Sequence, residues 1–106
     1  MFKPKESDWK TFSASLPAWR DRYFDRQTKD LSEKLVDQTK NPTDRYWDTF
    51  KFYKEHTKEV ERLLGDHSRS GMLLGLLGML HLGMLEESEL DVFSDELREK
   101  ILSMRH

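Results

Sequence analysis

Apolar residues between positions 16 and 39 recur with the period of an α-helix, and this pattern constrains the fold more than any other feature of the chain. Placed at about 100° per residue, they form one broad stripe, while charged residues occupy the opposite side. The stripe consists of Leu16, Trp19, Tyr23, Phe24, Leu31 and Leu35. A helix of this kind must bury its stripe, so the remaining segments are expected to pack around it.

Two serines are expected to mark helix starts in the first part of the chain. Ser7 predicts a short helix that runs to about Ser13, with residues 1–6 as a flexible tail. Ser15 is then the expected N-cap of the long helix, because Pro17 would lie in its first turn, where a missing N–H has no cost. The sequence thus predicts a short leading helix that is separate from the long one.

A second helix is bracketed by Pro42 and Gly65, with Thr43 as its expected N-cap. Its apolar residues follow a heptad pattern, which predicts a seam packed on the first helix. The seam consists of Tyr46, Phe50, Tyr53, Thr57, Val60 and Leu64. Trp47 falls outside this seam, so the core of the chain need not use it.

The most apolar segment is a run of 14 residues at positions 72–85. It is too short to span a membrane, which takes about 20 residues. Because its apolar residues point in all directions, we expect a central helix that begins at Asp66 or Ser68 and runs to about Leu85. Gly71, Gly75 and Gly78 form a narrow stripe on that helix, although each costs about 0.8–1 kcal/mol relative to Ala. Another helix is therefore expected to approach this stripe closely, within the chain or across a dimer.

Ser94 is the expected N-cap of a final helix that turns Leu97, Ile101 and Met104 inward. The predicted fold class is all-α: a single domain, residues 1–106, built as a compact antiparallel bundle of four main helices plus the short N-terminal helix. The absence of Cys excludes disulfides, thiolate catalysis and cysteine-ligated zinc. The chain does not open with an apolar export segment, so we expect a cytoplasmic protein.

Two polar residues in apolar surroundings are candidates for a structural or a ligand-binding role. Arg20 falls inside the stripe of the long helix and is expected to reach Glu59, Glu61, the carbonyl groups of residues 61–64, or an anion. His81 lies in the apolar run, so we expect it to be buried with a hydrogen-bond partner; the alternatives are a ligand-binding or proton-handling role and exposure in a surface groove. His81 has no second histidine or carboxylate at metal-site spacing within that run, and neither a metal nor a cofactor is expected.

A row of basic residues on the second helix supports nucleic-acid binding as an alternative function. Glu55 and Glu59 share the same side of the helix, and the net charge of the whole chain is only −2, so the row also fits a solvated helix face. The row consists of Lys51, Lys54, Lys58 and Arg62.

A second alternative is a catalytic or ligand-binding bundle. The spacing of Arg62 and His67 is similar to the Arg-x4-His pair of HEPN ribonucleases, which are also helical bundles. This resemblance implies phosphate binding by Arg62 and proton transfer by His67. The chain departs from the family pattern at Leu63, where those enzymes usually have a polar residue, and at Gly65, which breaks the helix between the pair.

The leading hypothesis is a non-enzymatic protein that acts through protein–protein contacts, as an adaptor, a regulator or an accessory subunit. The sequence contains no recognisable set of catalytic residues, phosphate-binding loop or metal cluster. We expect a homodimer that forms through an apolar helix face, with Trp47 at or beside the contact, because large aromatic residues outside a core are enriched at interfaces. In the opposing interpretation, Trp47 packs under a loop of its own chain.

Overall fold

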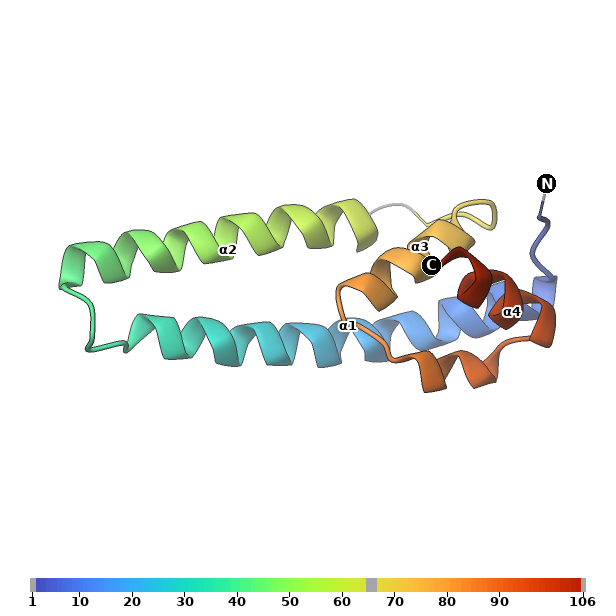
Figure 1. Cartoon of the computed structure of the whole chain (residues 1–106), viewed down its shortest axis with the longest axis horizontal. Coiled ribbons are helices and arrows are strands. Elements are labelled where there is room, and N and C mark those ends of the chain that lie inside the picture. Colours follow the sequence, from blue (N-terminus) through green and yellow to red (C-terminus); the bar gives the residue numbers. More distant parts are fainter. Residues whose placement is uncertain (1, 65–66, 106) are drawn as a thin grey trace.

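The computed structural model describes residues 2–64 and 67–105, with the backbone alone for 62–64. Every regular element in this part of the chain is a helix, which confirms the all-α prediction. The helices α1 and α2 form a long antiparallel hairpin, and the later elements gather around the N-terminal half of α1 (Figure 1). The elements are α1 (Glu6–Leu35), α2 (Pro42–Leu64), α3 (Met72–His81), the 3₁₀ helix η1 (Glu87–Val92) and α4 (Asp95–Met104).

The molecule is elongated. Its radius of gyration is 16.8 Å, whereas a compact chain of this length has one of about 13 Å. The cause is a mismatch of helix lengths, since α1 has 30 residues and α2 has 23, but α3 and α4 have 10 each. The short helices cover only one end of the hairpin. The other end, at the turn of residues 36–41, is called the distal end below.

The expected break between two N-terminal helices is absent. The helix α1 runs continuously from Glu6 through Pro17, and neither Ser7 nor Ser15 starts a helix. An interior proline costs about 3 kcal/mol relative to Ala. The continuous helix offsets this cost by carrying one buried stripe across the proline, and burial of each large apolar side chain contributes about 1.5–3 kcal/mol. That stripe consists of Phe12, Leu16, Trp19 and Tyr23.

The central helix is also shorter than expected. It begins at Met72 and ends at His81, whereas the apolar run continues to residue 85. The chain turns at Gly83, whose φ of 74° lies in the left-handed region that favours glycine. Met84 and Leu85 after this turn are buried, so they join the core from a loop rather than from a helix.

The core lies at the wide end of the molecule. Apart from Val60 on α2, its fully buried apolar residues come from the first two-thirds of α1 and from positions 72–101. Among the described residues, the last third of α1 and the first half of α2 contribute none of them. None of the described helices is long and apolar enough to cross a membrane.

One buried carboxylate joins the two ends of the chain. Asp8, in the first turn of α1, is 3% exposed and accepts hydrogen bonds from the backbone N–H of Ser94 at 2.8 Å and from its hydroxyl at 2.5 Å. The Ser94 oxygen in turn accepts from the N–H of Leu97, which confirms the predicted N-cap of α4. The bond from Asp8 therefore fixes the position of that cap relative to α1.

Two arginines on the outer side of α1 hold the segment between α3 and η1. Arg22 donates to both carboxylate oxygens of Glu89, at 2.9 and 2.7 Å, and to the carbonyl of Met84 at 2.7 Å. Arg26 donates to the carbonyl of Gly83. Glu89 also accepts from the N–H of Glu86 in a capping box, so one carboxylate supports both the start of η1 and its contact with α1.

The Arg22–Glu89 pair predicts a specific dependence of stability on pH. The hydrogen bonds from Arg22 lower the pKa of Glu89 below its ordinary value of 4.5. A lowered pKa means that the pair stabilises the fold above about pH 4.5 and that this contribution is lost as the pH falls through the folded-state pKa. Glu89→Gln is therefore expected to be less stable than the wild type at pH 7, by an amount that shrinks towards pH 3. Urea unfolding at both pH values measures it, and a deficit that is independent of pH would contradict the assignment.

The glycine stripe of α3 does not meet another helix among the described residues. A Cβ on Gly71 would lie 3.1 Å from the hydroxyl of Ser68, and one on Gly75 would lie 3.8 Å from the ring of His67. Both neighbours belong to the segment that leads into α3. The described residues therefore do not supply the close helix contact within the chain that the spacing of Gly71, Gly75 and Gly78 predicted.

This environment predicts that Gly75→Ala is stabilising. The added methyl group would meet the His67 ring at an ordinary contact distance, and Ala is favoured over Gly in a helix by about 0.8–1 kcal/mol. We expect the free energy of unfolding to rise by about 0.5–1 kcal/mol in urea titrations. A loss of stability would indicate that a second backbone packs on the stripe after all.

Candidate functional site

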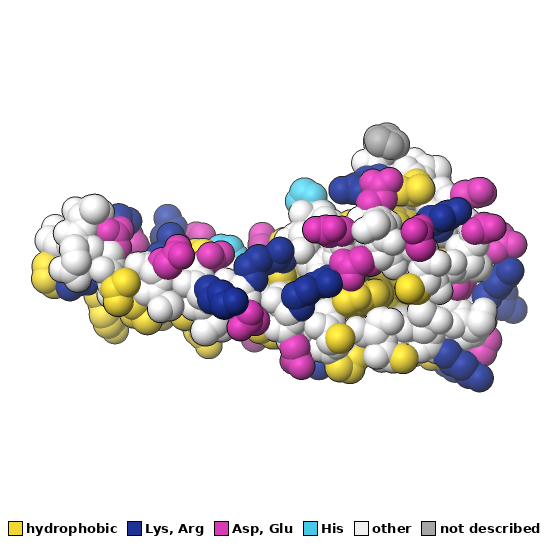
Figure 2. All heavy atoms as spheres, turned by 90° about the horizontal axis from the view of Figure 1, so that it is seen from below, with side chains coloured by type: hydrophobic (Ala, Val, Ile, Leu, Met, Phe, Trp, Pro, Cys, Tyr) yellow, Lys and Arg dark blue, Asp and Glu magenta, His cyan; other side chains and the backbone are white. Residues whose placement is uncertain are grey.

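A group of exposed apolar side chains lies on one side of the hairpin, towards its distal end (Figure 2). Tyr46 is 67% exposed, Trp47 59% and Tyr53 58%, which is unusual for such large residues. Hydrophobic side chains gather along one edge of the narrow end of the molecule (Figure 2). We call this surface the distal face; it consists of Phe24, Leu31 and Leu35 on α1 and Tyr46, Trp47, Phe50 and Tyr53 on α2.

The distal face exists because α2 is rotated relative to its predicted seam. Among the described side chains of α2, Thr49 and Val60 are buried, and the half-buried ones include Phe52 and His56. These four share one side of the helix, and Tyr46, Phe50 and Tyr53 are displaced from it. The prediction that those three aromatic residues pack in the core is therefore wrong. They border the contact between α1 and α2 and remain open to solvent.

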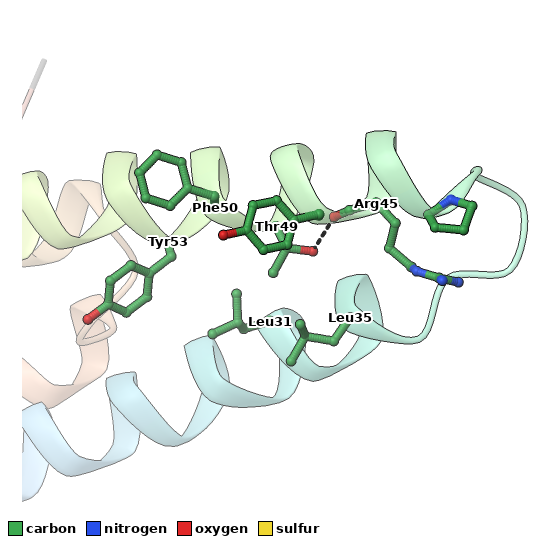
Figure 3. Close-up of a pocket in the computed structure, with 8 residues that line it drawn as sticks. Leu31, Leu35, Arg45, Thr49, Phe50 and Tyr53 are labelled. Carbon is green, nitrogen blue, oxygen red and sulfur yellow. Dashed lines mark hydrogen bonds between the residues drawn. The ribbon is translucent and has the colours of Figure 1, made fainter.

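Between the two helices the distal face forms a groove of about 460 Å³. Leu31 and Leu35 point from α1 towards α2, and Tyr53 points from α2 towards α1 (Figure 3). A smaller cavity of about 90 Å³ continues along the hairpin, and Leu31 and Tyr53 line both spaces. Phe24 also lines this second cavity, so apolar side chains border the contact between α1 and α2 from Phe24 to Leu35.

Three aromatic rings on α2 touch one another at the surface. The ring centroids of Tyr46 and Trp47 are 5.3 Å apart, and those of Trp47 and Phe50 are 6.1 Å apart, both in edge-to-face geometry. Trp47 therefore completes an aromatic cluster on the distal face and is not covered by a loop. Rings in mutual contact are held in defined positions, which lowers the entropy lost when a partner binds them.

Hydrogen bonds and an ion pair hold the turn of residues 36–41 against the start of α2. Asn41 caps α2 in place of the predicted Thr43, because its side-chain oxygen accepts from the N–H of Asp44 at 2.9 Å and Pro42 then takes the first helical position. Arg45 reaches back across the turn to the carbonyl of Asp37 at 3.3 Å. An ion pair between Lys40 and Asp48 adds a second link from the turn to α2. These contacts fix the first turn of α2, from which the aromatic cluster extends.

The basic row of α2 lies beside the distal face. The ammonium group of Lys54 is 6.0 Å from the centroid of the Phe50 ring, and Lys51 and Lys58 are exposed. Glu55 and Glu59 are exposed as well, as the sequence predicted. The side chain of Arg62 lies outside the described residues, so the nucleic-acid surface and the Arg62–His67 pair both stay predictions.

The two predicted polar-core residues have different outcomes. His81 is exposed at the last position of α3, so the expectation of a buried histidine is wrong; Met79, Leu80 and Met84 occupy the inward positions instead. Arg20 is half-buried, and its Nε is enclosed without a hydrogen-bond partner among the described residues. The predicted link from Arg20 to Glu59 or Glu61 is not found in that part of the chain.

No known protein family, curated protein or solved structure matches this chain. The functional argument therefore depends on the distal face itself. The sequence identified Trp47 as a residue outside the core, but it assigned Tyr46, Phe50, Tyr53 and Leu35 to the interior. Helix length is a signal that could have shown these four residues to be exposed. The apolar stripes of the two long helices extend beyond the part that the short later helices can cover.

Proposed function

We propose that this protein acts through protein–protein contacts, as an adaptor, a regulator or an accessory subunit, and that the distal face is its binding surface. The observation that carries the proposal is the unpartnered aromatic cluster of Tyr46, Trp47 and Phe50 beside an apolar groove. Contiguous apolar surface of this kind is rare on monomeric proteins and is typical of sites that bind another protein.

The chemistry of the distal face fits a protein partner better than a small polar ligand. Tyrosine and tryptophan combine a large apolar area with a polar tip, and they dominate the energy of protein interfaces. Among the residues that the structure describes, Arg45 is the only charged one lining the groove, and its guanidinium donates to the carbonyl of Asp37. A partner that covers the groove therefore meets one charged group, and this group already donates to a backbone carbonyl.

Affinity capture from native cells tests this proposal with two matched variants. Tyr46 and Leu74 are both 67% exposed, but only Tyr46 belongs to the distal face, whereas Leu74 lies on α3. We expect the wild type and Leu74→Lys to retain the same bound protein in stoichiometric amount and Tyr46→Lys to lose it. The bound protein is either an untagged second copy or a different chain. Identical recovery by all three proteins would contradict the proposed surface.

A further inference from the structure

We propose that the protein covering the distal face is a second copy of this chain, so that two hairpins form a four-helix bundle at their distal ends. This inference rests on the proposed function, because it names the partner of the same surface. Two helices can line a groove but cannot enclose one, and a second hairpin supplies the two helices that an enclosed bundle requires. The remaining helices of the same chain pack at the wide end and leave this part of the hairpin uncovered.

The exposed area of the distal face is of the size that a stable dimer needs. An aromatic side chain offers about 150–250 Å² for burial. With the exposed fractions of its six exposed residues, that is, without the half-buried Leu31, the distal face offers on the order of 700 Å² per copy. A standard protein interface buries about 800 Å² per partner. The distal face therefore offers an area comparable to one side of a standard interface.

The charges around the distal face are compatible with self-association. Helical periodicity places the exposed Lys54 and Lys58 beside the face on the outer side of α2. It places Asp21 and Asp25 beside the face on the outer side of α1, where Asp25 is already ion-paired with Lys29 at 3.0 Å. A twofold axis that runs along the hairpin places α1 of each copy over α2 of the other, so acidic and basic rims meet. The net charge of −2 per chain adds little long-range repulsion between two copies.

Sedimentation equilibrium of the purified full chain tests the dimer directly. We expect the wild type to dimerise, and Tyr46→Lys to raise the dissociation constant about 30-fold or more, as loss of a central aromatic contact does. Leu74→Lys is expected to change the constant by less than about threefold, because an equally exposed residue outside the interface has little effect.

A second pair of variants introduces no charge and so separates the loss of an aromatic side chain from the effect of an added lysine. Trp47 and Val92 are both 59% exposed, and only Trp47 lies on the distal face. Trp47→Ala is expected to weaken the dimer while retaining the helical circular dichroism of the wild type, and Val92→Ala is expected to leave both unchanged. Equal effects within either pair would overturn the assignment of the interface to this face.

A wild type that remains monomeric at high micromolar concentration would overturn the inference. That result would leave the proposed function standing if Tyr46→Lys still lost a different captured protein, since the capture experiment reports on any chain that covers the face. A monomeric wild type together with unchanged capture by Tyr46→Lys would overturn both.

Discussion

Replacing Phe12 with Ala is expected to lower the free energy of unfolding by about 3–5 kcal/mol. Phe12 has no exposed surface, and its ring contacts the rings of Trp9, Trp19 and His67 at centroid distances of 5.9, 6.3 and 5.2 Å. Truncation would remove the contacts of the whole ring and leave a cavity between α1 and the start of α3. Urea unfolding followed by circular dichroism measures the loss.

Phe24→Ala is the matched control, because it removes the same side chain from the same helix on the distal face. Phe24 is 41% exposed, so its truncation is expected to cost about 1 kcal/mol or less in protein dilute enough to be monomeric. Equal losses for the two variants would contradict the division of the molecule into a stabilising wide end and an uncovered distal end.

Asp8→Ala has the second largest expected effect, a loss of about 2–3 kcal/mol. The substitution leaves the N–H and the hydroxyl of Ser94 without their acceptor in a largely enclosed position, and it removes an acidic group from the first turn of α1. Thermal and urea unfolding are the appropriate measurements. The same variant is expected to weaken the packing of α4, seen as faster amide hydrogen exchange at residues 95–101.

Asp8→Asn separates the hydrogen bonds from the charge. The Asn side chain retains one acceptor oxygen for the N–H of Ser94, so we expect it to recover about half of the stability lost in Asp8→Ala. Ser94→Ala keeps the backbone N–H that donates to Asp8, so Asp8→Ala is expected to have only part of its effect in that background, and an undiminished effect would show that the hydroxyl bond contributes nothing.

Sequence periodicity located the helices well and their boundaries poorly, for identifiable physical reasons. The Ser94 cap was predictable because a cap depends on residues a few positions apart. The continuity of α1 through Pro17 was not predictable in this way. It depends on a buried stripe in which residues on both sides of the proline pack against later helices. The local signals at Ser7, Ser15 and Pro17 instead predicted two separate helices.

The candidate site was only partly accessible from sequence. Trp47 was separable from the seam by its helical angle alone. The exposure of Tyr46, Phe50 and Tyr53 depends on how many helices lie around them, and a heptad pattern does not distinguish a partner helix in the same chain from one in a second chain. The bond between Asp8 and Ser94 joins residues 86 positions apart, and no local pattern indicates such a contact.

Photo-crosslinking from the distal face tests the central claim, that another protein covers this face in the cell. Phe50 lies within the aromatic cluster, and a photoreactive phenylalanine analogue at this position preserves its ring, while the same analogue at Leu74 on α3 is the control. We predict an adduct from position 50 and none from position 74, with a mass twice that of the 12.7 kDa chain if the partner is a second copy. No adduct from position 50, or equal adducts from both positions, would contradict the account.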